Sequence, residues 1–346
     1  MLSLVPQFSL ASNATEKSWK QALDQEIAGL ARRFKGRISI YVSDPKLNVK
    51  YRHDAQEPIY IASGVKVPFM IEVYRQASQG LISLDDKIPY KANDQRDGAP
   101  RLGKVPLGTM LSVKKLVTLM IQASDNAASD MLANYVGIEN INRGMRAEGF
   151  NMVNPLVSLL DVREGVFREL DFRADDLTNL EVRKVRWTWG WKSHVAQLEK
   201  FLGRPRGTYS VDELHAAYDR FYETKVNHVP VETLGNIIES LLAKTLVSKK
   251  ASEEMLEIMS NAKTSRNRMM GKLPRDTRVA HKTGSQWERI CDYGAMWLPD
   301  GEPLVFAGCL AGGEDRKLAE ATMASIARKA YDLSVRDRRK SNKSSR

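Results

Sequence analysis

The chain has 346 residues, of which 42% are hydrophobic and 27% are charged, as in an ordinary globular protein. No apolar run approaches the roughly 20 residues that a membrane-spanning helix needs. The formal net charge is +11, but residues 182–206 and 336–346 hold the whole excess. Charge confined to one stretch and a tail is more typical of solvated segments than of a nucleic-acid site, so we expect no nucleic-acid partner.

The two ends of the chain differ from its body. Residues 1–16 are mildly apolar and end in small residues, but the first basic residue is Lys17, so the positive start of a signal peptide is missing. This segment is either a clipped or mis-started export signal or a floppy leader. Residues 336–346 are basic and are expected to form a disordered tail. One domain is expected between them, over residues 17–335.

The first part of the chain begins with a helical pattern and then alternates. Apolar residues recur at helical spacing over residues 16–35, and Gly36 follows as a stop signal. The stretch RISIYVSD, residues 37–44, alternates between apolar and polar and predicts a strand. A short second strand at residues 49–52 would complete a hairpin. A helix is then predicted over residues 63–79.

The middle of the chain favours helices, and the end returns to strands. Residues 151–176 show no regular pattern, and residues 177–228 are basic, rich in tryptophan and best interpreted as an elaboration of the core fold. Further helices are predicted at residues 113–123, 126–135, 138–148, 231–242, 252–261 and 315–333, and strands at residues 278–283, 292–298 and 304–310.

This order of elements predicts a mixed α/β (α+β) fold. Strands at both chain ends with helices between them indicate a mostly antiparallel sheet whose first and last parts join. The inserted helical subdomain would span about residues 63–261, and the basic, tryptophan-rich insert about residues 177–228.

Two cysteines, Cys291 and Cys309, lie on either side of the turn signal Pro299-Asp300-Gly301. A hairpin with a three-residue loop at this turn would place the cysteines opposite each other and allow a cross-strand disulfide. A shift of one residue in the register would place them on opposite faces. The sequence leaves both arrangements open.

Three short motifs with reactive side chains occur along the chain. Each alone is weak, because a serine and a lysine at this spacing occur by chance, an S-D-N string often only caps a helix, and K-T-G often only follows a strand. Together they are a strong signal, because they respectively open a helix, join two helices and end a strand. The motifs are Ser63-Gly64-Val65-Lys66, Ser124-Asp125-Asn126 and Lys282-Thr283-Gly284.

This combination resembles the penicillin-recognising serine hydrolases, and within them the class A β-lactamases and their relatives. The similarity extends beyond the motifs, because MIQASDNAASDML is similar to the family's helix–SDN–helix segment, RVAHKTGS to its motif strand and YGAMWLPDGEPLVFA to the following hairpin. It covers roughly residues 19–333, with residues 177–228 outside it. The resemblance implies a β-lactamase/transpeptidase-like fold and hydrolysis of a β-lactam amide through a serine acyl-enzyme.

The resemblance assigns a catalytic role to three side chains of the first two motifs. Ser63 would attack the carbonyl carbon, and Lys66, one helical turn on, would take its proton if burial and a nearby cation such as Lys282 lower the pKa of its ammonium group. Ser124 would relay a proton to the departing nitrogen, or cap the next helix, or do both. Asp125 is expected to be structural.

Substrate binding is expected from the second and third motifs. The Asn126 amide would meet an amide of the substrate, and Lys282 would attract a substrate carboxylate, with Thr283, Gly284 and Ser285 beside it. The resemblance also implies that the backbone N–H groups of Ser63 and Ser285 form an oxyanion hole. Arg289 would be either a further carboxylate anchor or an exposed edge-strand arginine.

One feature of the class A pattern is missing. Those enzymes use a glutamate in an E-x-x-L-N string after the S-D-N region to activate the water that clears the acyl-enzyme, and this chain has no such string. Glu164 and Glu169 are the candidates, with Glu164 preferred as the catalytic base. Without such a base the protein would act like a penicillin-binding D-alanyl-D-alanine peptidase or a slow-deacylating β-lactam binder. A non-catalytic binding module is a further alternative.

The remaining expectations concern partners and location. The histidines show no metal-ligand spacing, and no glycine-rich phosphate loop is present, so neither a metal nor a cofactor is expected. The partner would be a small-molecule β-lactam or a peptidoglycan stem peptide, and a monomer is expected. Substrates of the cell wall imply an extracytoplasmic (periplasmic or secreted) location.

Overall fold

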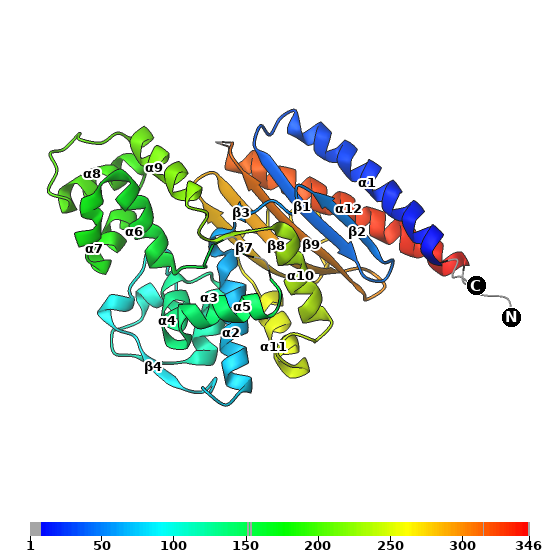
Figure 1. The fold of residues 1–346 in the computed structure, drawn as a ribbon, viewed down its shortest axis with the longest axis horizontal. Coiled ribbons are helices and arrows are strands. Elements are labelled where there is room, and N and C mark those ends of the chain that lie inside the picture. The colour runs from blue at the N-terminus through cyan, green and yellow to red at the C-terminus, as the bar shows by residue number, and fades with distance from the viewer. Residues whose placement is uncertain (1–7, 151, 153, 314, 345–346) are drawn as a thin grey trace.

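A five-stranded antiparallel sheet forms the middle layer of the protein (Figure 1). The computed structural model describes residues 8–150, 152, 154–313 and 315–344. The sheet order β2-β1-β9-β8-β7 joins the first and last strands of the chain, which confirms the predicted mixed fold. The strands are β1 (Arg37–Asp44), β2 (Val49–His53), β7 (Val279–Gln286), β8 (Arg289–Trp297) and β9 (Pro303–Ala311).

Two long helices, α1 (Phe8–Ala31) and α12 (Arg316–Ser344), lie side by side over one face of the sheet (Figure 1). Ile40 of β1 belongs to the apolar core on this face together with Trp19 of α1, whereas Tyr41 belongs to the core on the opposite face, as the alternation predicts. The indole N–H of Trp19 donates to a carboxylate oxygen of α12 at 3.0 Å. This face therefore joins the two ends of the described chain.

The expectations for the chain ends need correction. The first helix begins at Phe8 and not near residue 16, so the segment interpreted as a leader runs into α1; its residues 1–7 lie outside the described residues. Residues 336–344 are helical and not a disordered tail, because Arg338 is buried and donates to both carboxylate oxygens of Asp44 at 2.9 Å. Residues 345 and 346 lie outside the described residues. The sequence of residues 336–346 does not indicate that Arg338 pairs with Asp44, because the two residues are far apart in the chain.

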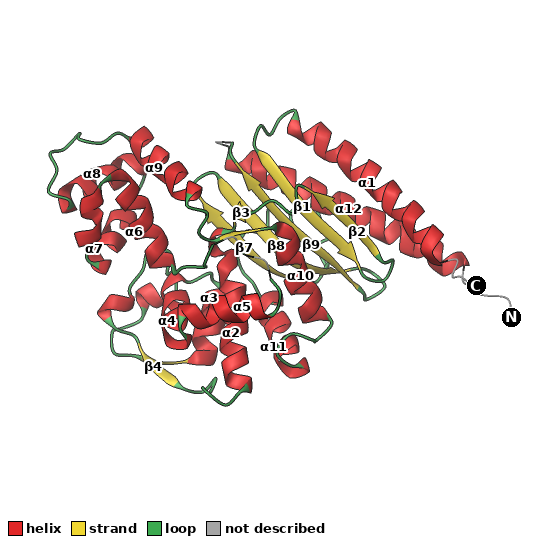
Figure 2. Ribbon diagram, viewed as in Figure 1, coloured by secondary structure: helices red, strands yellow, loops and turns green. Residues whose placement is uncertain are grey.

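Helices cover the other face of the sheet (Figure 2). A second, larger core forms between them and the sheet. No helix in the described ranges is both long and apolar enough to cross a membrane. These helices are α2 (Lys66–Ser78), α3 (Val113–Gln122), α4 (Asn126–Val136), α5 (Ile138–Ala147), α10 (Val231–Leu242) and α11 (Lys249–Ser260). Two further pairs of short strands are antiparallel: β3 (Ile59–Tyr60) pairs with β6 (His228–Val229), and β4 (Lys87–Pro89) pairs with β5 (Met110–Ser112).

The span of residues 151–176, expected to be irregular, contains a helix, α6 (Leu159–Leu170). Ser158 and Asp161 form a capping box at its start, and Val162 and Val166 bury one face. Residues 151 and 153 lie outside the described part. The helical elaboration therefore begins with α6 and not near residue 177.

The helices α6 to α9 gather at one end of the molecule and share a third apolar core (Figure 1). Tyr222 donates from its hydroxyl to the carbonyl of Trp287 at 2.9 Å, which attaches this unit to the turn between β7 and β8. We call α6 to α9 the helical insert; its other members are α7 (Asn179–Trp187), α8 (Trp191–Phe201) and α9 (Val211–Glu223).

Cys291 of β8 and Cys309 of β9 are register partners and form a disulfide, with their Cα atoms 4.1 Å apart. Of the two arrangements that the sequence allowed, the structure shows the cross-strand bond. This bond links two neighbouring strands of the sheet, β8 and β9.

Replacing Arg338 by alanine is expected to lower the free energy of unfolding by about 3–5 kcal/mol, because it leaves a buried carboxylate without its cation. Urea unfolding followed by circular dichroism measures this loss. Lys340→Ala is the matched control, since this side chain on the same helix is 71% exposed; its change should stay below about 1 kcal/mol. Equal losses of unfolding free energy in the two variants would contradict a stabilising role for the buried Arg338–Asp44 ion pair.

Candidate active site

Ser63 lies in a short 3-10 turn, Ala62–Val65, and the α-helix that the sequence predicted from this serine begins at Lys66. The turn is pressed against the sheet, because a Cβ atom added to Gly284 of β7 would lie 2.1 Å from the Ile61 carbonyl oxygen. Ala62 has a φ of 48°, a region that residues other than glycine rarely adopt. The surrounding structure thus holds the serine in a constrained turn.

The Lys66 side chain is fully buried at the start of α2. Its ammonium group donates to the Ser124 carbonyl at 2.7 Å, to the Asn126 side-chain oxygen at 2.7 Å and to the Ser124 hydroxyl at 3.3 Å. Burial lowers the pKa of Lys66 to about 7, although Asp130 and other carboxylates oppose the shift. The Ser63 hydroxyl makes no hydrogen bond to any described residue.

Lys282 of β7 is the second buried cation of the site. Its ammonium group donates to the Ser124 hydroxyl at 3.0 Å and to the Thr283 carbonyl at 2.7 Å. Burial, together with the neighbouring charge of Lys66, holds the pKa of Lys282 well below its usual value. The three motifs therefore meet in space, with the Ser124 hydroxyl between the two lysines.

The S-D-N turn is fixed by Asp125 and not by Ser124. The Asp125 carboxylate caps α4 by accepting from the Ala128 N–H at 3.1 Å, and it also accepts from the N–H groups of Arg101 and Leu102 at 3.0 Å. Asp125 is structural, as expected. Ser124 has a φ of 53° and its hydroxyl is directed to the lysines, so the alternative that it caps the helix is wrong.

Arg268 is a site residue that the sequence analysis missed. It is fully buried below β7 and donates to the carbonyl of Gly284 and to the hydroxyl of Ser285, both at 2.6 Å. The Thr283 hydroxyl lies 2.8 Å from that of Thr264. Arg268 comes from an irregular segment with no local pattern, so only the tertiary structure reveals its position.

The two remaining predicted residues, Arg289 and Glu164, have other neighbours in the described structure than the two lysines. Arg289 stacks on the ring of Tyr222, 4.3 Å from its centroid, and lies 3.9 Å from the carboxylate of Asp219 in the helical insert. Glu164 lies half-buried on α6 and makes no hydrogen bond or ion pair with any described residue. Burial, and then the charge of Asp161, raise the pKa of Glu164.

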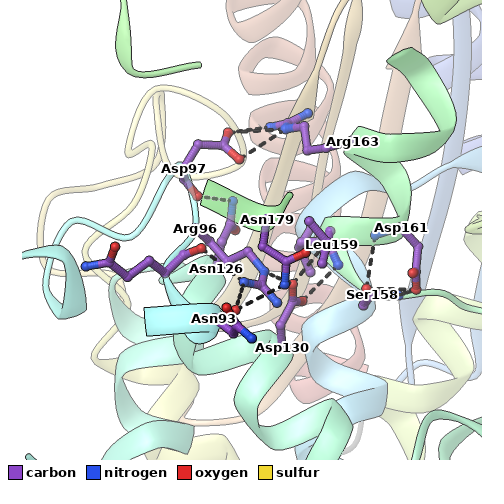
Figure 3. A network of polar contacts seen from close by, with 12 residues as sticks. Asn93, Arg96, Asp97, Asn126, Asp130, Ser158, Leu159, Asp161, Arg163 and Asn179 are labelled. Carbon is purple, nitrogen blue, oxygen red and sulfur yellow. Dashed lines mark hydrogen bonds and ion pairs between the residues drawn. The ribbon is translucent and has the colours of Figure 1, made fainter. Parts of the chain in front are cut away.

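A network of charged groups connects the S-D-N turn with α6 (Figure 3). Asn126 donates from its amide to the carbonyl of Asp97 at 2.9 Å, and the Asp97 carboxylate forms an ion pair with Arg163 at 3.0 Å. Asp130 of α4 pairs with Arg96 at 2.7 Å and also accepts from the first N–H groups of α6. The start of the helical insert is therefore attached to the site by buried charges.

No group of three or more histidine, cysteine, aspartate and glutamate side chains is placed to hold a metal ion among the residues that the structure describes.

Known proteins with the same architecture include several β-lactamases. The β-lactamase VEB-1 of Pseudomonas aeruginosa is 21% identical over 84% of this chain and 82% of its own. The carbapenem-hydrolyzing β-lactamase KPC of Klebsiella oxytoca is 23% identical over 89% of this chain and 87% of its own. The crystal structure of the TLA-3 extended-spectrum β-lactamase superposes with a TM-score of 0.69 at 18% identity, covering 90% of this chain and 98% of that one.

A second solved structure, a β-lactamase from Chitinophaga pinensis, gives a TM-score of 0.68 at 20% identity, with 90% of this chain and 98% of that chain covered. At these identities the structures establish the fold. The model of the β-lactamase enzyme family matches residues 22–333. The chain therefore belongs to the β-lactamase enzyme family and is a β-lactamase-like serine hydrolase.

Proposed function

We propose that Ser63 opens a β-lactam ring by attacking its carbonyl carbon and forming an acyl-enzyme. The observation that supports this most directly is the pair of buried lysines that share one hydroxyl: Lys66 and Lys282 both donate to Ser124. Two adjacent ammonium groups without solvent are costly, and such an arrangement is typical of a catalytic site and not of a structural one.

The proton follows a short route in this proposal. Neutral Lys66 accepts the proton of Ser63 while the serine oxygen bonds to the carbonyl carbon, and the side chains approach each other as the substrate binds. Ser124 gives its proton to the ring nitrogen as the carbon–nitrogen bond breaks, and Lys66 restores it. The hydroxyl of Ser124 lies 3.3 Å from Lys66, which suits this relay.

Binding roles follow from the family resemblance and the geometry. Asn126 would hold the acyl amide of the substrate, and Lys282, Thr283 and Ser285 its ring carboxylate, with Arg268 orienting the Ser285 hydroxyl. The backbone N–H groups of Ser63 and Ser285 would stabilise the oxyanion. Gly284 contributes by allowing β7 to approach the serine turn.

Glu164 is proposed as the base that activates the deacylating water. It is half-buried, its pKa is raised, and no cation of the described residues forms an ion pair with it, so its carboxylate can accept a proton. Glu169, by contrast, is paired with Arg220 at 3.5 Å. If Glu164 does not serve, the acyl-enzyme would persist and the protein would bind β-lactams, or cleave stem peptides, without efficient turnover of the drug.

We also propose an extracytoplasmic location. The Cys291–Cys309 disulfide supports it, because disulfides persist in oxidising compartments and are rare in the reducing cytosol.

Ser63→Ala is expected to abolish both hydrolysis of benzylpenicillin and formation of a covalent adduct, because Ser63 is the proposed nucleophile and Ser124, the hydroxyl between the lysines, has the role of a proton donor. Intact-mass spectrometry after rapid mixing detects the adduct. Ser78→Ala, an exposed serine on α2, is the control and should behave as the wild type. Hydrolysis that survives in Ser63→Ala would contradict the proposed nucleophile.

The acylation rate is expected to rise about tenfold per pH unit below pH 7 and to level off above it, since only neutral Lys66 accepts a proton and its pKa is lowered to about 7. As the pH falls below the pKa of Lys66, its ammonium form accumulates, the neutral base is lost and acylation slows. Single-turnover acylation at each pH measures the profile, with circular dichroism confirming the fold. A flat profile across this range would rule out Lys66 as the base.

Glu164→Gln is expected to lengthen the lifetime of the acyl-enzyme about 100-fold or more, while the rate of its formation changes little. Time-resolved mass spectrometry of the penicilloyl adduct separates the two steps. Glu169→Gln is the matched control on the same helix and should leave the lifetime unchanged. A wild-type adduct that already persists would identify a slow-deacylating penicillin binder instead.

A further inference from the structure

A cavity of about 310 Å³ lies beside Ser285, where β7 turns into β8, and extends between the helical insert and the start of α12. Its volume suits a substituent of a small molecule and not a whole protein segment. Its walls combine basic and aromatic side chains with one acidic residue, Glu288. The basic and aromatic residues are Arg163, Arg186, Arg289, Arg316, Trp191 and Trp287.

Arg163 and Arg186 share a single carboxylate. Arg163 lies 3.0 Å from Asp97, whereas Arg186 lies 3.8 Å from it, too far for a hydrogen bond. Two guanidinium groups beside one carboxylate leave one positive charge in excess. Arg289 lies 3.9 Å from the carboxylate of Asp219, and Arg316 shares the carboxylate of Glu320 with Arg268, so the whole cavity is positively charged.

Arg186 is the less satisfied of the two. Its Nε, which is the nitrogen 3.8 Å from Asp97, is buried and has no hydrogen-bond partner among the described residues. Its guanidinium lies 5.3 Å from the ring centroid of Trp191, and another nitrogen lies 3.1 Å from a ring nitrogen of His194. Burial lowers the pKa of Arg186, as expected for a cation without a sufficient counter-charge. An anion in the cavity would supply the counter-charge that the Arg186 guanidinium lacks.

Arg163, a wall residue of the cavity, is linked through Asp97 to the residue proposed to bind the substrate's acyl amide. Asn126, the proposed ligand of that amide, bonds directly to the backbone of Asp97 (Figure 3). On the other side, Arg163 donates to the side chain of Gln286 at 2.9 Å, next to Ser285. An acyl side chain held at Asn126 would therefore reach the cavity on the side of Arg163.

We propose that Arg163 and Arg186 form a subsite for a carboxylate carried by the acyl side chain of the substrate, with Trp191 and Trp287 lining the space for an adjoining aromatic ring. This inference rests on the proposed function of the same site and specifies its substrate class: β-lactams with a second negative charge on the acyl side. The ring carboxylate is bound elsewhere, by Lys282 and its neighbours.

The test compares benzylpenicillin with carbenicillin, which carries one additional carboxylate on the acyl side chain. The ratio of kcat/KM for carbenicillin to that for benzylpenicillin is expected to fall about tenfold in Arg186→Met, which keeps the aliphatic packing and removes the charge. Lys184→Met removes an exposed charge from the same helix and should leave the ratio unchanged. Arg186→Lys should restore part of the ratio.

Asp97→Asn provides an independent readout. Removing the Asp97 carboxylate, which competes for the two arginines, should raise the ratio of kcat/KM for carbenicillin to that for benzylpenicillin. A merely structural role would not shift this ratio in opposite directions in Asp97→Asn and Arg186→Met. An unchanged ratio in Arg186→Met, or an equal loss with both substrates, would overturn the subsite while leaving the proposed function intact. Failure of the wild type to be acylated by either penicillin would instead refute the proposed function, and the subsite with it.

Discussion

The hydrogen bonds from two buried ammonium groups to one hydroxyl constrain the rest of the structure. Lys66 and Lys282 come from a helix and a strand that are far apart in the sequence, and both reach Ser124. Two such cations repel each other in a low dielectric, so at neutral pH the site favours a state with fewer than two full charges. Burial lowers the pKa of both lysines, and the charge of Lys66 lowers that of Lys282 further, which makes a lysine available as a base.

Such an unfavourable arrangement persists only if the surrounding backbone cannot relax. Gly284 lets β7 lie against the serine turn without an intervening side chain, and the hydroxyl of Tyr293 donates to the Gly64 carbonyl at 2.8 Å from the neighbouring strand. Asp125 fixes the opposite wall through three backbone N–H groups. Positive φ angles occur at Ala62, directly before Ser63, and at Ser124, so the backbone is strained in both turns that position the two serine hydroxyls.

The parts of this structure that are local in the sequence could be predicted, and the parts that depend on distant partners could not. Alternation in RISIYVSD assigned the faces of β1, and the order of three motifs predicted the meeting of Lys66, Ser124 and Lys282. By contrast, nothing near Arg338 signals its pairing with a carboxylate on β1, and Arg268 lies in a segment without periodicity. A buried ion pair is set by tertiary contacts, which composition and spacing do not encode.

The absence of the E-x-x-L-N string and the presence of α6, a helix that the sequence did not predict, concern the same span of the chain. In class A enzymes the glutamate belongs to a loop after the S-D-N region, whereas in this chain the same span begins a helix whose first N–H groups bind Asp130. Burial raises the pKa of Asp130, but Arg96 and those N–H groups favour its charged form. Because α6 carries both Arg163 and Glu164, the anchor at its start also sets the position of the cation facing the cavity and of the proposed deacylating base. Substrate preference and acyl-enzyme lifetime are therefore expected to depend on the same helix.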